Sequence, residues 1–285
     1  MEKNKLINEI EDKSELMRRD CIEMGYAAGS QGAHFGPALS CVDIVATLFF
    51  GVMHHDPKNP EMPERDRFVL SKGHACLAYY AALIETGYIP KDMISQFKGN
   101  NSIFSGHPSM NMQYGIEVST GSLGNGFPIA CGMAKAAKIK GEAHHVYCIV
   151  GDGECNEGII WEAAFNAAKY KLNNLTAIVD INDFQLSGRT FEVMPINLEA
   201  LWQAAGWEVF NIGDGNDVAE VLQMLTKVKE TQYEKPQVIL TKTVKGKGIS
   251  FMENNLGFHA APINEEQYKQ AIADLKQAEM IRREQ

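Results

Sequence analysis

Two stretches near the beginning of the chain have the hydrophobic spacing of helices. Apolar residues recur every three or four positions over residues 14–30 and 40–51. Gly32, Gly36 and Pro37 interrupt the pattern between them. We therefore expect two helices joined by a loop, with His34 on that loop.

Short apolar runs alternate with helical patterns in the second half of the chain. The runs lie at residues 146–150, 175–181, 207–212 and 237–243. This alternation predicts βαβ units, so the expected fold class is α/β, a parallel β-sheet flanked by helices. Residues 264–285 begin like a capped helix. We expect residues 1–285 to form a single domain that ends in this helical tail.

Composition and charge narrow the class of protein. With 45% hydrophobic and 22% charged residues, the 285-residue chain can bury a large core. The net charge is -9 and no basic stripe is present, so nucleic acid is not an expected partner. The N-terminus is charged throughout, with no signal-peptide or membrane-spanning pattern. The six cysteines form no CxxC pair and are interpreted as reduced thiols, so we expect a cytoplasmic protein without membrane contact.

The most informative segment combines a strand, a Gly-Asp-Gly turn at 151–153, a helix that begins near Glu157, a second strand and then Asn182. The two glycines let the backbone approach an anion closely, and the helix N-terminus directs its positive end at a phosphate. The aspartate and the Asn182 side-chain oxygen are hard donors suited to Mg2+ or Ca2+. Together they predict a diphosphate bridged by a metal ion.

Other interpretations of this segment are weaker. Glycine, aspartate and asparagine are enriched in turns for steric reasons alone, so a bare Gly-Asp-Gly turn could be structural. Ile159 and Ile160 stand where a P-loop has its lysine and Ser/Thr, and no GxGxxG follows a strand. ATP and NAD sites are therefore disfavoured.

The segment resembles the thiamine diphosphate signature, in which an aspartate, an asparagine and a backbone carbonyl two residues further on hold Mg2+. Four other segments resemble transketolase and occur in the same order, together covering roughly residues 16–262. They are RFVLSKGHACLAYYAAL, FSGHP, VSTGSLGNGFPIACGMA and KTVKGKGISFMENN. The chain is thus similar to the N-terminal, diphosphate-binding part of a transketolase.

The resemblance implies a set of site residues. Mg2+, for which Ca2+ or Mn2+ can substitute, is held by Asp152, Asn182 and the carbonyl of Phe184. The implied contacts of thiamine diphosphate are His74, Gly121, Leu123, Gly151, Asp152, Gly153, Asn182 and His259, with Gly121 and Leu123 near its thiazolium and aminopyrimidine rings. The implied catalytic residues are His34, His107, His259 and Glu157.

Histidine suits this chemistry because it titrates near neutral pH and can move protons on and off sugar hydroxyls. His34 and His107 are expected to face the sugar, and Glu157 to lie at a subunit interface. A glutamate in the first turn of a helix also complements the helix dipole, so its structural interpretation stays open. Lys245 either assists the diphosphate or lies in a solvated turn. We interpret the remaining four histidines as structural: His54, His55, His144 and His145.

The sequence departs from transketolases in two places. Ala33 and Phe35 flank His34 in QGAHFGPALS, so the sugar pocket is expected to differ. The substrate is then an ordinary pentose phosphate or a modified ketose such as a deoxy or sulfonated sugar. No segment resembles the second domain, which binds the aminopyrimidine and supplies an activating glutamate. We therefore expect the partner to be a C-terminal transketolase subunit, in an α2β2 heterotetramer.

The implied reaction is transfer of a two-carbon ketol unit from a ketose phosphate to an aldose. The α subunit of a 2-oxo-acid dehydrogenase shares the Gly-Asp-Gly and asparagine pattern, but SKGHA and SGHP argue against it. Deoxyxylulose-phosphate synthase is disfavoured by length. A catalytically silent module with the same fold is a further alternative, against which the retained Asp152, Asn182 and histidines argue.

Overall fold

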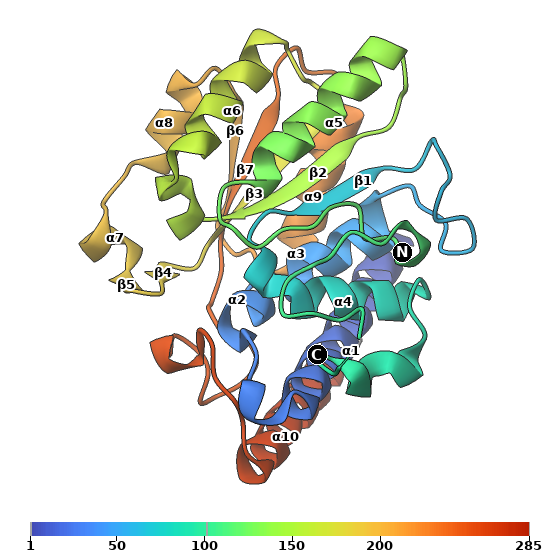
Figure 1. Cartoon of the computed structure of the whole chain (residues 1–285), viewed down its shortest axis with the longest axis vertical. Helices are drawn as coiled ribbons and strands as arrows, with labels where there is room; N and C mark the ends of the chain where they lie inside the picture. Colours follow the sequence, from blue (N-terminus) through green and yellow to red (C-terminus); the bar gives the residue numbers. More distant parts are fainter. Residues whose placement is uncertain (1, 101, 285) are drawn as a thin grey trace.

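Five parallel strands form the central sheet of the computed structural model, which describes residues 2–100 and 102–284 (Figure 1). The strands lie in the order β1-β2-β3-β7-β6. Their bounds are β1 Arg67–Leu70, β2 Val146–Gly151, β3 Leu175–Ile181, β6 Glu208–Ile212 and β7 Gln237–Lys242. The α/β class is confirmed, and four of these strands match the predicted runs. Strand β1 was not predicted; its four residues are at the lower limit of the run length that indicates a strand.

Residues alternate between the two faces of the sheet, and both faces are buried. In β2, Val146, Cys148 and Val150 pack into one core, whereas Tyr147 and Ile149 pack into the other. Such strands have apolar residues on both sides, as expected for a parallel sheet covered by helices. The fold is therefore a three-layer arrangement.

The helices are divided between the two cores. One face is covered by α5 (Gly126–Lys140), α6 (Gly158–Lys169) and α8 (Leu198–Ala204). The other is covered by α1 (Glu2–Ala27), α3 (Val42–Thr47), α4 (Cys76–Thr86) and α9 (Val218–Glu230). The remaining short elements are α2 (Phe35–Leu39), the π-helical turn η2 (Leu48–Val52), α7 (Thr190–Val193), a hairpin of β4 (Phe184–Gln185) and β5 (Gly188–Arg189), and the 3-10 turns η1 (Gly29–Gln31), η3 (Gly73–Ala75), η4 (Lys91–Gln96), η5 (Met112–Tyr114), η6 (Gly153–Asn156) and η7 (Leu256–Phe258).

The first helix is longer than its hydrophobic spacing predicted. It begins at Glu2 rather than near Ser14, although most of its first two turns are charged or polar. Ile10 is fully buried, and Lys5 and Glu9 form an ion pair one turn apart at 3.8 Å. Tertiary packing of a few apolar residues thus extends a helix through a charged segment.

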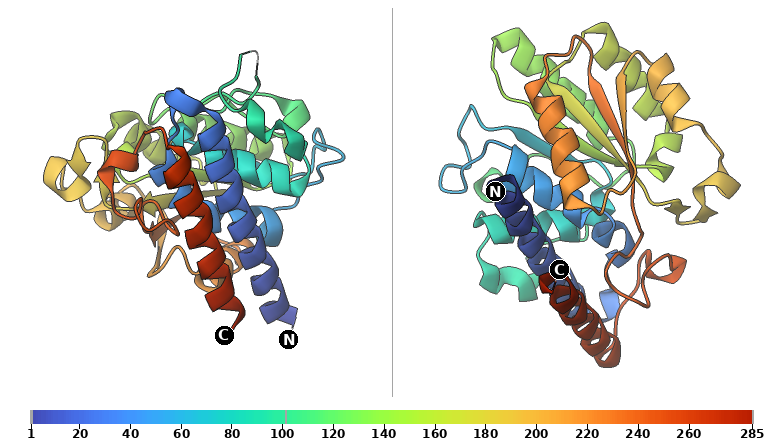
Figure 2. Two further views of the ribbon diagram at one scale, coloured as in Figure 1. Left: turned by 90° about the horizontal axis from the view of Figure 1, so that it is seen from below. Right: turned by 180° about the vertical axis from the view of Figure 1, so that it is seen from behind.

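Helix α10 (Glu265–Arg283) packs antiparallel against α1, so the C-terminal end of α10 lies beside the first half of α1 (Figure 2). It begins with a capping box between Asn264 and Gln267. Arg282 then bridges to α1, contacting the carboxylates of Glu11, Asp12 and Glu15.

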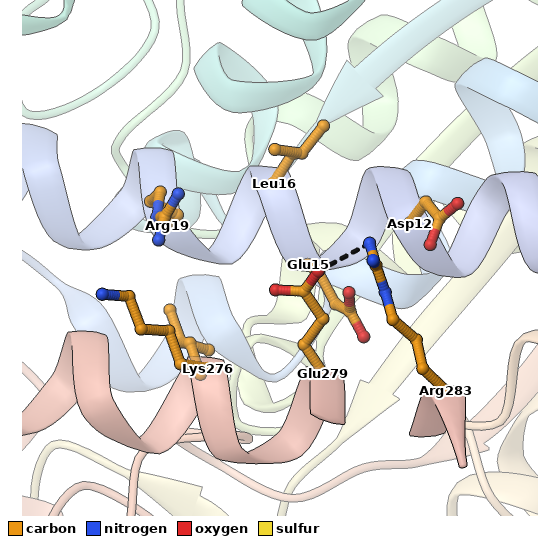
Figure 3. A pocket seen from close by; sticks show the side chains of 8 residues that line it. Asp12, Glu15, Leu16, Arg19, Lys276, Glu279 and Arg283 are labelled. Atoms are coloured by element: carbon orange, nitrogen blue, oxygen red, sulfur yellow. Dashed lines mark ion pairs between the residues drawn. The ribbon is translucent and has the colours of Figure 1, made fainter. Parts of the chain in front are cut away.

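A cavity of about 270 Å³ lies between α1 and α10 (Figure 3). Its walls are charged on both sides, and Glu279 pairs with Arg283 at 2.6 Å on α10 itself. These ion pairs are partly solvated, so they contribute little to stability individually. No helix in the described part of the chain is both long and apolar enough to cross a membrane.

Candidate active site

The carboxyl ends of neighbouring strands meet at one edge of the sheet, where the loops that follow β1, β2, β3 and β7 enclose a cavity of about 350 Å³. Ligands of parallel sheets bind at this edge. Every predicted site residue except His107 lines the cavity: His34, His74, Gly121, Leu123, Gly151, Asp152, Gly153, Glu157, Asn182, Phe184 and His259. His107 lies just outside this set, with its ring 5.6 Å from that of His34.

Asp152 and Asn182 lie on one side of the cavity. Each is only 5% exposed, although both come directly after strand ends. The Asp152 carboxylate accepts hydrogen bonds from the backbone N–H groups of Gly153 and Asp183, both at 2.8 Å. Burial, and then the nearby Asp180 carboxylate, raise the pKa of Asp152 to about 7.

Asp180 orients the amide of Asn182. The Asn182 Nδ2 donates to Asp180 Oδ2 at 3.0 Å, whereas its Oδ1 accepts from the backbone N–H of Phe184 at 3.2 Å. The amide oxygen is therefore directed to the same side as the Phe184 backbone. Within the described residues, no group of three or more His, Cys, Asp or Glu side chains could hold a metal ion, so any metal here depends on amide and backbone oxygens as well.

Lys72 was not among the predicted residues, yet it is 1% exposed and lines the cavity. Its ammonium pairs with Asp180, which also accepts from Ser40 Oγ at 2.7 Å and from the Thr243 hydroxyl. Burial opposes both charges, but the Lys72 ammonium keeps the pKa of Asp180 low, and the Asp180 carboxylate raises that of Lys72. Nothing in the surrounding sequence, SKGH, indicates that this lysine is buried.

Four histidines form a cluster at the cavity, and all of them except His107 line it. The His34 ring lies 5.6 Å from those of His74 and His107 and 5.9 Å from that of His259, between ring centroids. His74 and His259 stack at 5.2 Å. Burial, then the neighbouring positive groups, lower the pKa of His34 to about 4 and that of His259 to about 3, and lower those of His74 and His107. The imidazoles are therefore neutral at neutral pH.

Lys245 is buried beside this cluster, which contradicts a solvated turn. It is 1% exposed, and its Nζ lies 2.9 Å from His259 Nδ1. Burial, followed by the ammonium of Lys72, lowers the pKa of Lys245 to about 8. A buried ammonium that is hydrogen-bonded to a neutral imidazole gains no negative charge from that partner. An anionic ligand would supply one.

Glu154 is a second residue that sequence reasoning missed. It is 2% exposed and its two oxygens accept three hydrogen bonds, from Ser71 Oγ at 2.5 Å, from Gly124 N at 2.8 Å and from Gly151 N at 3.0 Å. Ser71 follows β1, Gly124 precedes α5, and Gly151 is the last residue of β2. In the sequence Glu154 only follows a Gly-Asp-Gly turn, and nothing local indicates its long-range partners.

Glu157 and Phe35 are two further residues for which an expectation followed from the sequence. Glu157 lines the cavity but is exposed, as a residue at an interface would be in the isolated chain. Phe35, which was expected to alter the sugar pocket, is fully buried and packs so closely on Gly25 that a Cβ there would lie 2.2 Å from its ring. Its side chain therefore fills the core rather than the cavity.

Comparison with known proteins agrees with this geometry. The family described as "Transketolase, thiamine diphosphate binding domain" matches residues 15–278. The chain belongs to the transketolase family. It is 39% identical over 94% of its length to an apulose-4-phosphate transketolase subunit of Actinobacillus succinogenes, of which it covers 96%. It is 43% identical over 85% of its length to the 6-deoxy-6-sulfo-D-fructose transketolase subunit SqwG of Clostridium sp. (strain MSTE9), of which it covers 88%.

Solved transketolases share the fold. The structure of transketolase from Campylobacter jejuni superposes with a TM-score of 0.85 and 31% identity, over 94% of this chain. This chain spans 42% of that one, so it corresponds to the thiamine diphosphate-binding part of the longer transketolase. The family and its cofactor are those that the sequence motifs indicated, and the transketolase relatives do not favour a dehydrogenase α subunit.

Proposed function

We propose that the chain binds thiamine diphosphate through Mg2+ in this cavity and, with a second subunit, transfers a two-carbon ketol unit from a ketose phosphate to an aldose. The observation that carries the proposal is the arrangement of opposite charges around one cavity. Asp152 and the oxygen of Asn182 line the same cavity as Lys245, His74 and His259.

Each side is electrostatically unsatisfied by the protein alone. The raised pKa of Asp152 indicates that its carboxylate needs a cation, and the lowered pKa of Lys245 indicates that its ammonium needs an anion. A metal ion alone would leave the Lys245 ammonium without an anion. A phosphate without a metal ion would place its negative charge near the Asp152 carboxylate. A diphosphate with a bound divalent cation satisfies both sides at once.

Different residues would bind the metal ion, the diphosphate and the rings of the cofactor. Asp152, the Asn182 side chain and the Phe184 carbonyl would hold Mg2+, with Ca2+ or Mn2+ as substitutes. The diphosphate would lie against the Gly-Asp-Gly backbone, His74 and His259, with Lys245 beside it. Gly121 and Leu123 would border the thiazolium and aminopyrimidine rings, and the 36% exposure of Leu123 leaves an apolar surface for them.

The bound cofactor supplies the electron sink for cleavage and formation of the C–C bond. His34 and His107 would accept protons from, and return them to, the sugar hydroxyls. Their lowered pKa values keep both imidazoles unprotonated at neutral pH, which is the form that accepts a proton.

We propose that the whole chain, 1–285, is one such domain and that its partner is a C-terminal transketolase subunit with the pyrimidine-binding domain. Two relatives are themselves named as subunits, and the chain covers 96% and 88% of them. Glu157, exposed at the cavity, would face a subunit neighbour, and an α2β2 heterotetramer would place it near the twofold axis.

Substrate choice is best tested with a panel of ketose donors. One relative is named for apulose-4-phosphate and another for 6-deoxy-6-sulfo-D-fructose. Phe35 is fully buried, so its side chain does not occupy the cavity beside His34. We therefore propose a modified ketose as donor, to be compared directly with xylulose 5-phosphate.

The first test measures binding and turnover of Asp152→Ala and Asn182→Ala. Both should abolish Mg2+-dependent binding of thiamine diphosphate in calorimetry, and ketol transfer in a coupled assay with the partner subunit, because each removes a metal ligand. Asn166→Ala, which removes an exposed amide from α6, is the control. Undiminished turnover at ordinary Mg2+ would contradict the ligand assignment, and an inactive wild-type complex that still binds cofactor would favour a silent module.

A further inference from the structure

Lys98 joins the two loops that carry His34 and His107. Its Nζ donates hydrogen bonds to the carbonyl oxygens of Gly32 at 2.9 Å and Gln31 at 3.3 Å, on the loop that leads to His34. In return, Gln31 Nε2 donates to the carbonyl oxygen of Lys98 at 3.2 Å. The two loops are thus linked in both directions by residues that lie 66 and 67 positions apart in the sequence.

The backbone at Lys98 is held in a strained conformation. Its φ is 55°, in the left-handed region that lysine rarely adopts, and its N–H donates to the carbonyl of Phe104 at 2.7 Å. Such strain persists only where the surroundings impose it, and it is frequent at functional sites. Glycine would relieve the strain but would lose the two side-chain contacts.

Gly106 provides the space in which the lysine side chain lies. A Cβ at that position would be 2.8 Å from Lys98 Cε, well inside contact distance. The chain has no positive φ at Gly106, so the backbone there would accept alanine. An alanine at Gly106 would therefore displace the end of the Lys98 side chain.

The charge of Lys98 also acts on both histidines. Burial is the largest cause of the lowered pKa of His107, and Lys98 is the next. For His34 the causes are burial, then His107, Lys98 and Lys245. The charged and titratable groups that face the two imidazoles from the surrounding loops are His34, His74, Lys98, His107, Lys245 and His259.

We propose that Lys98 is a positioning residue that fixes the His34 and His107 loops in the one arrangement that presents both imidazoles to the sugar. The inference rests on the proposed function in assigning those imidazoles to the sugar. It does not require Lys98 itself to touch the substrate, since its donors are directed at two backbone carbonyls.

The kinetic test is a double-mutant cycle of Lys98→Met, Gly106→Ala and the pair. Lys98→Met should lower kcat/KM for the ketose about tenfold, because small displacements of reacting groups cost one to two orders of magnitude. Gly106→Ala should have a similar effect by displacing the lysine, and the double variant should be no worse than either alone. Affinity for thiamine diphosphate should stay unchanged. Lys140→Met, which removes the same charge from the exposed end of α5, is the control.

Three further readouts separate positioning from other roles. Lys98→Arg should restore activity partly, and the loss in Lys98→Met should be equal for a phosphorylated and an uncharged ketose. A loss confined to the phosphorylated donor would mean direct contact with the anion and would overturn the proposal. The acid limb of kcat/KM should move to higher pH in Lys98→Met, because loss of the positive charge raises the pKa of both imidazoles.

Histidine NMR titration of the full chain tests the same point without turnover. The His34 and His107 resonances should titrate at higher pH in Lys98→Met than in wild type, whereas those of His145 should not change. If the wild-type complex shows no ketol transfer, the proposed function fails while this measurement still tests the link between the loops. Unchanged titration and unchanged kcat/KM in Lys98→Met would refute the positioning role.

Discussion

At the scale of single residues, buried polar groups are what hold the cavity together. Glu154 joins the end of β2 to the loops after β1 and before α5 through one carboxylate, and Asp180 accepts from Lys72 and from the Asn182 amide. Buried groups of this kind must be fully partnered, because an unpaired donor in a low-dielectric interior loses its interaction with water. Lys72 lies 108 positions from Asp180 and Ser71 lies 83 positions from Glu154, so these two carboxylates fix distant loops relative to one another.

We predict that Glu154→Ala lowers the free energy of unfolding by about 3 kcal/mol, because it leaves a hydroxyl and two backbone N–H groups buried without an acceptor. Cofactor affinity should fall with it, since the loops that carry candidate cofactor contacts lose their common anchor. Urea denaturation and calorimetry with thiamine diphosphate measure the two effects. Glu162→Ala, at an exposed position on α6, is the control. Equal stability of the two variants would exclude this anchoring role.

The candidate site could be located from the sequence because its residues follow local rules. Gly151, Asp152 and Asn182 come directly after predicted strands, and parallel strands bring their carboxyl ends to one edge. Lys72 and Lys98 could not be found in this way. Lysines are normally solvated, and only the folded chain shows that one is buried on a carboxylate and the other bound to two carbonyls.

At the scale of elements, packing decides where helices begin and local chemistry decides how they are capped. The charged start of α1 forms helix because Ile10 is buried and α10 lies alongside it. Hydrophobic spacing located the strands that are flanked by helices, but not β1, whose four residues follow a segment of prolines and charges. Patterns are thus detected more easily in longer elements, where the repeat recurs several times.

We predict that Asn264→Ala destabilises the protein by about 1 kcal/mol, the usual contribution of an N-cap side chain. Asn264 Oδ1 accepts from the Gln267 N–H at 2.8 Å, and the Gln267 side chain accepts from the Asn264 N–H at 3.0 Å. Asn264→Ser keeps a capping oxygen and should be close to wild type. The comparison is made by thermal and urea unfolding, and equal losses in both variants would show that the cap does not account for the effect.

At the scale of the whole molecule, the cavity opens beside an exposed apolar segment. Leu186, which lines the cavity, is 72% exposed, and Phe191 and Met194 on or next to α7 are 57% and 49% exposed. Exposed apolar groups that are contiguous with a functional site mark interaction surfaces. The segment projects from the sheet edge beyond β4 and β5 (Figure 1). A partner that covers the cofactor would bury it.

The chain alone is therefore predicted to bind thiamine diphosphate weakly and to show no ketol transfer. Activity should appear when a subunit with the pyrimidine-binding domain is added, and light scattering should then give the mass of two copies of each chain. Cofactor affinity should increase in the complex, because the partner removes the bound cofactor from water. Strong ketol transfer by the purified single chain, with mass spectrometry excluding a host partner, would contradict the split-enzyme proposal.

Phe191→Asp should weaken this assembly, because it places a charge on the apolar segment that the partner is expected to bury. The matched control is Ile139→Asp, near the C-terminal end of α5, where the side chain is 76% exposed but remote from the cavity. Titration of the partner followed by turnover should show a dissociation constant at least about tenfold higher for Phe191→Asp, as expected for a central interface residue, and an unchanged value for Ile139→Asp. At saturating partner both variants should reach the wild-type rate, because neither residue belongs to the cavity. If both variants weaken assembly equally, general loss of surface hydrophobicity explains the effect and the partner does not dock on α7. If neither does, the partner covers the cavity from another side.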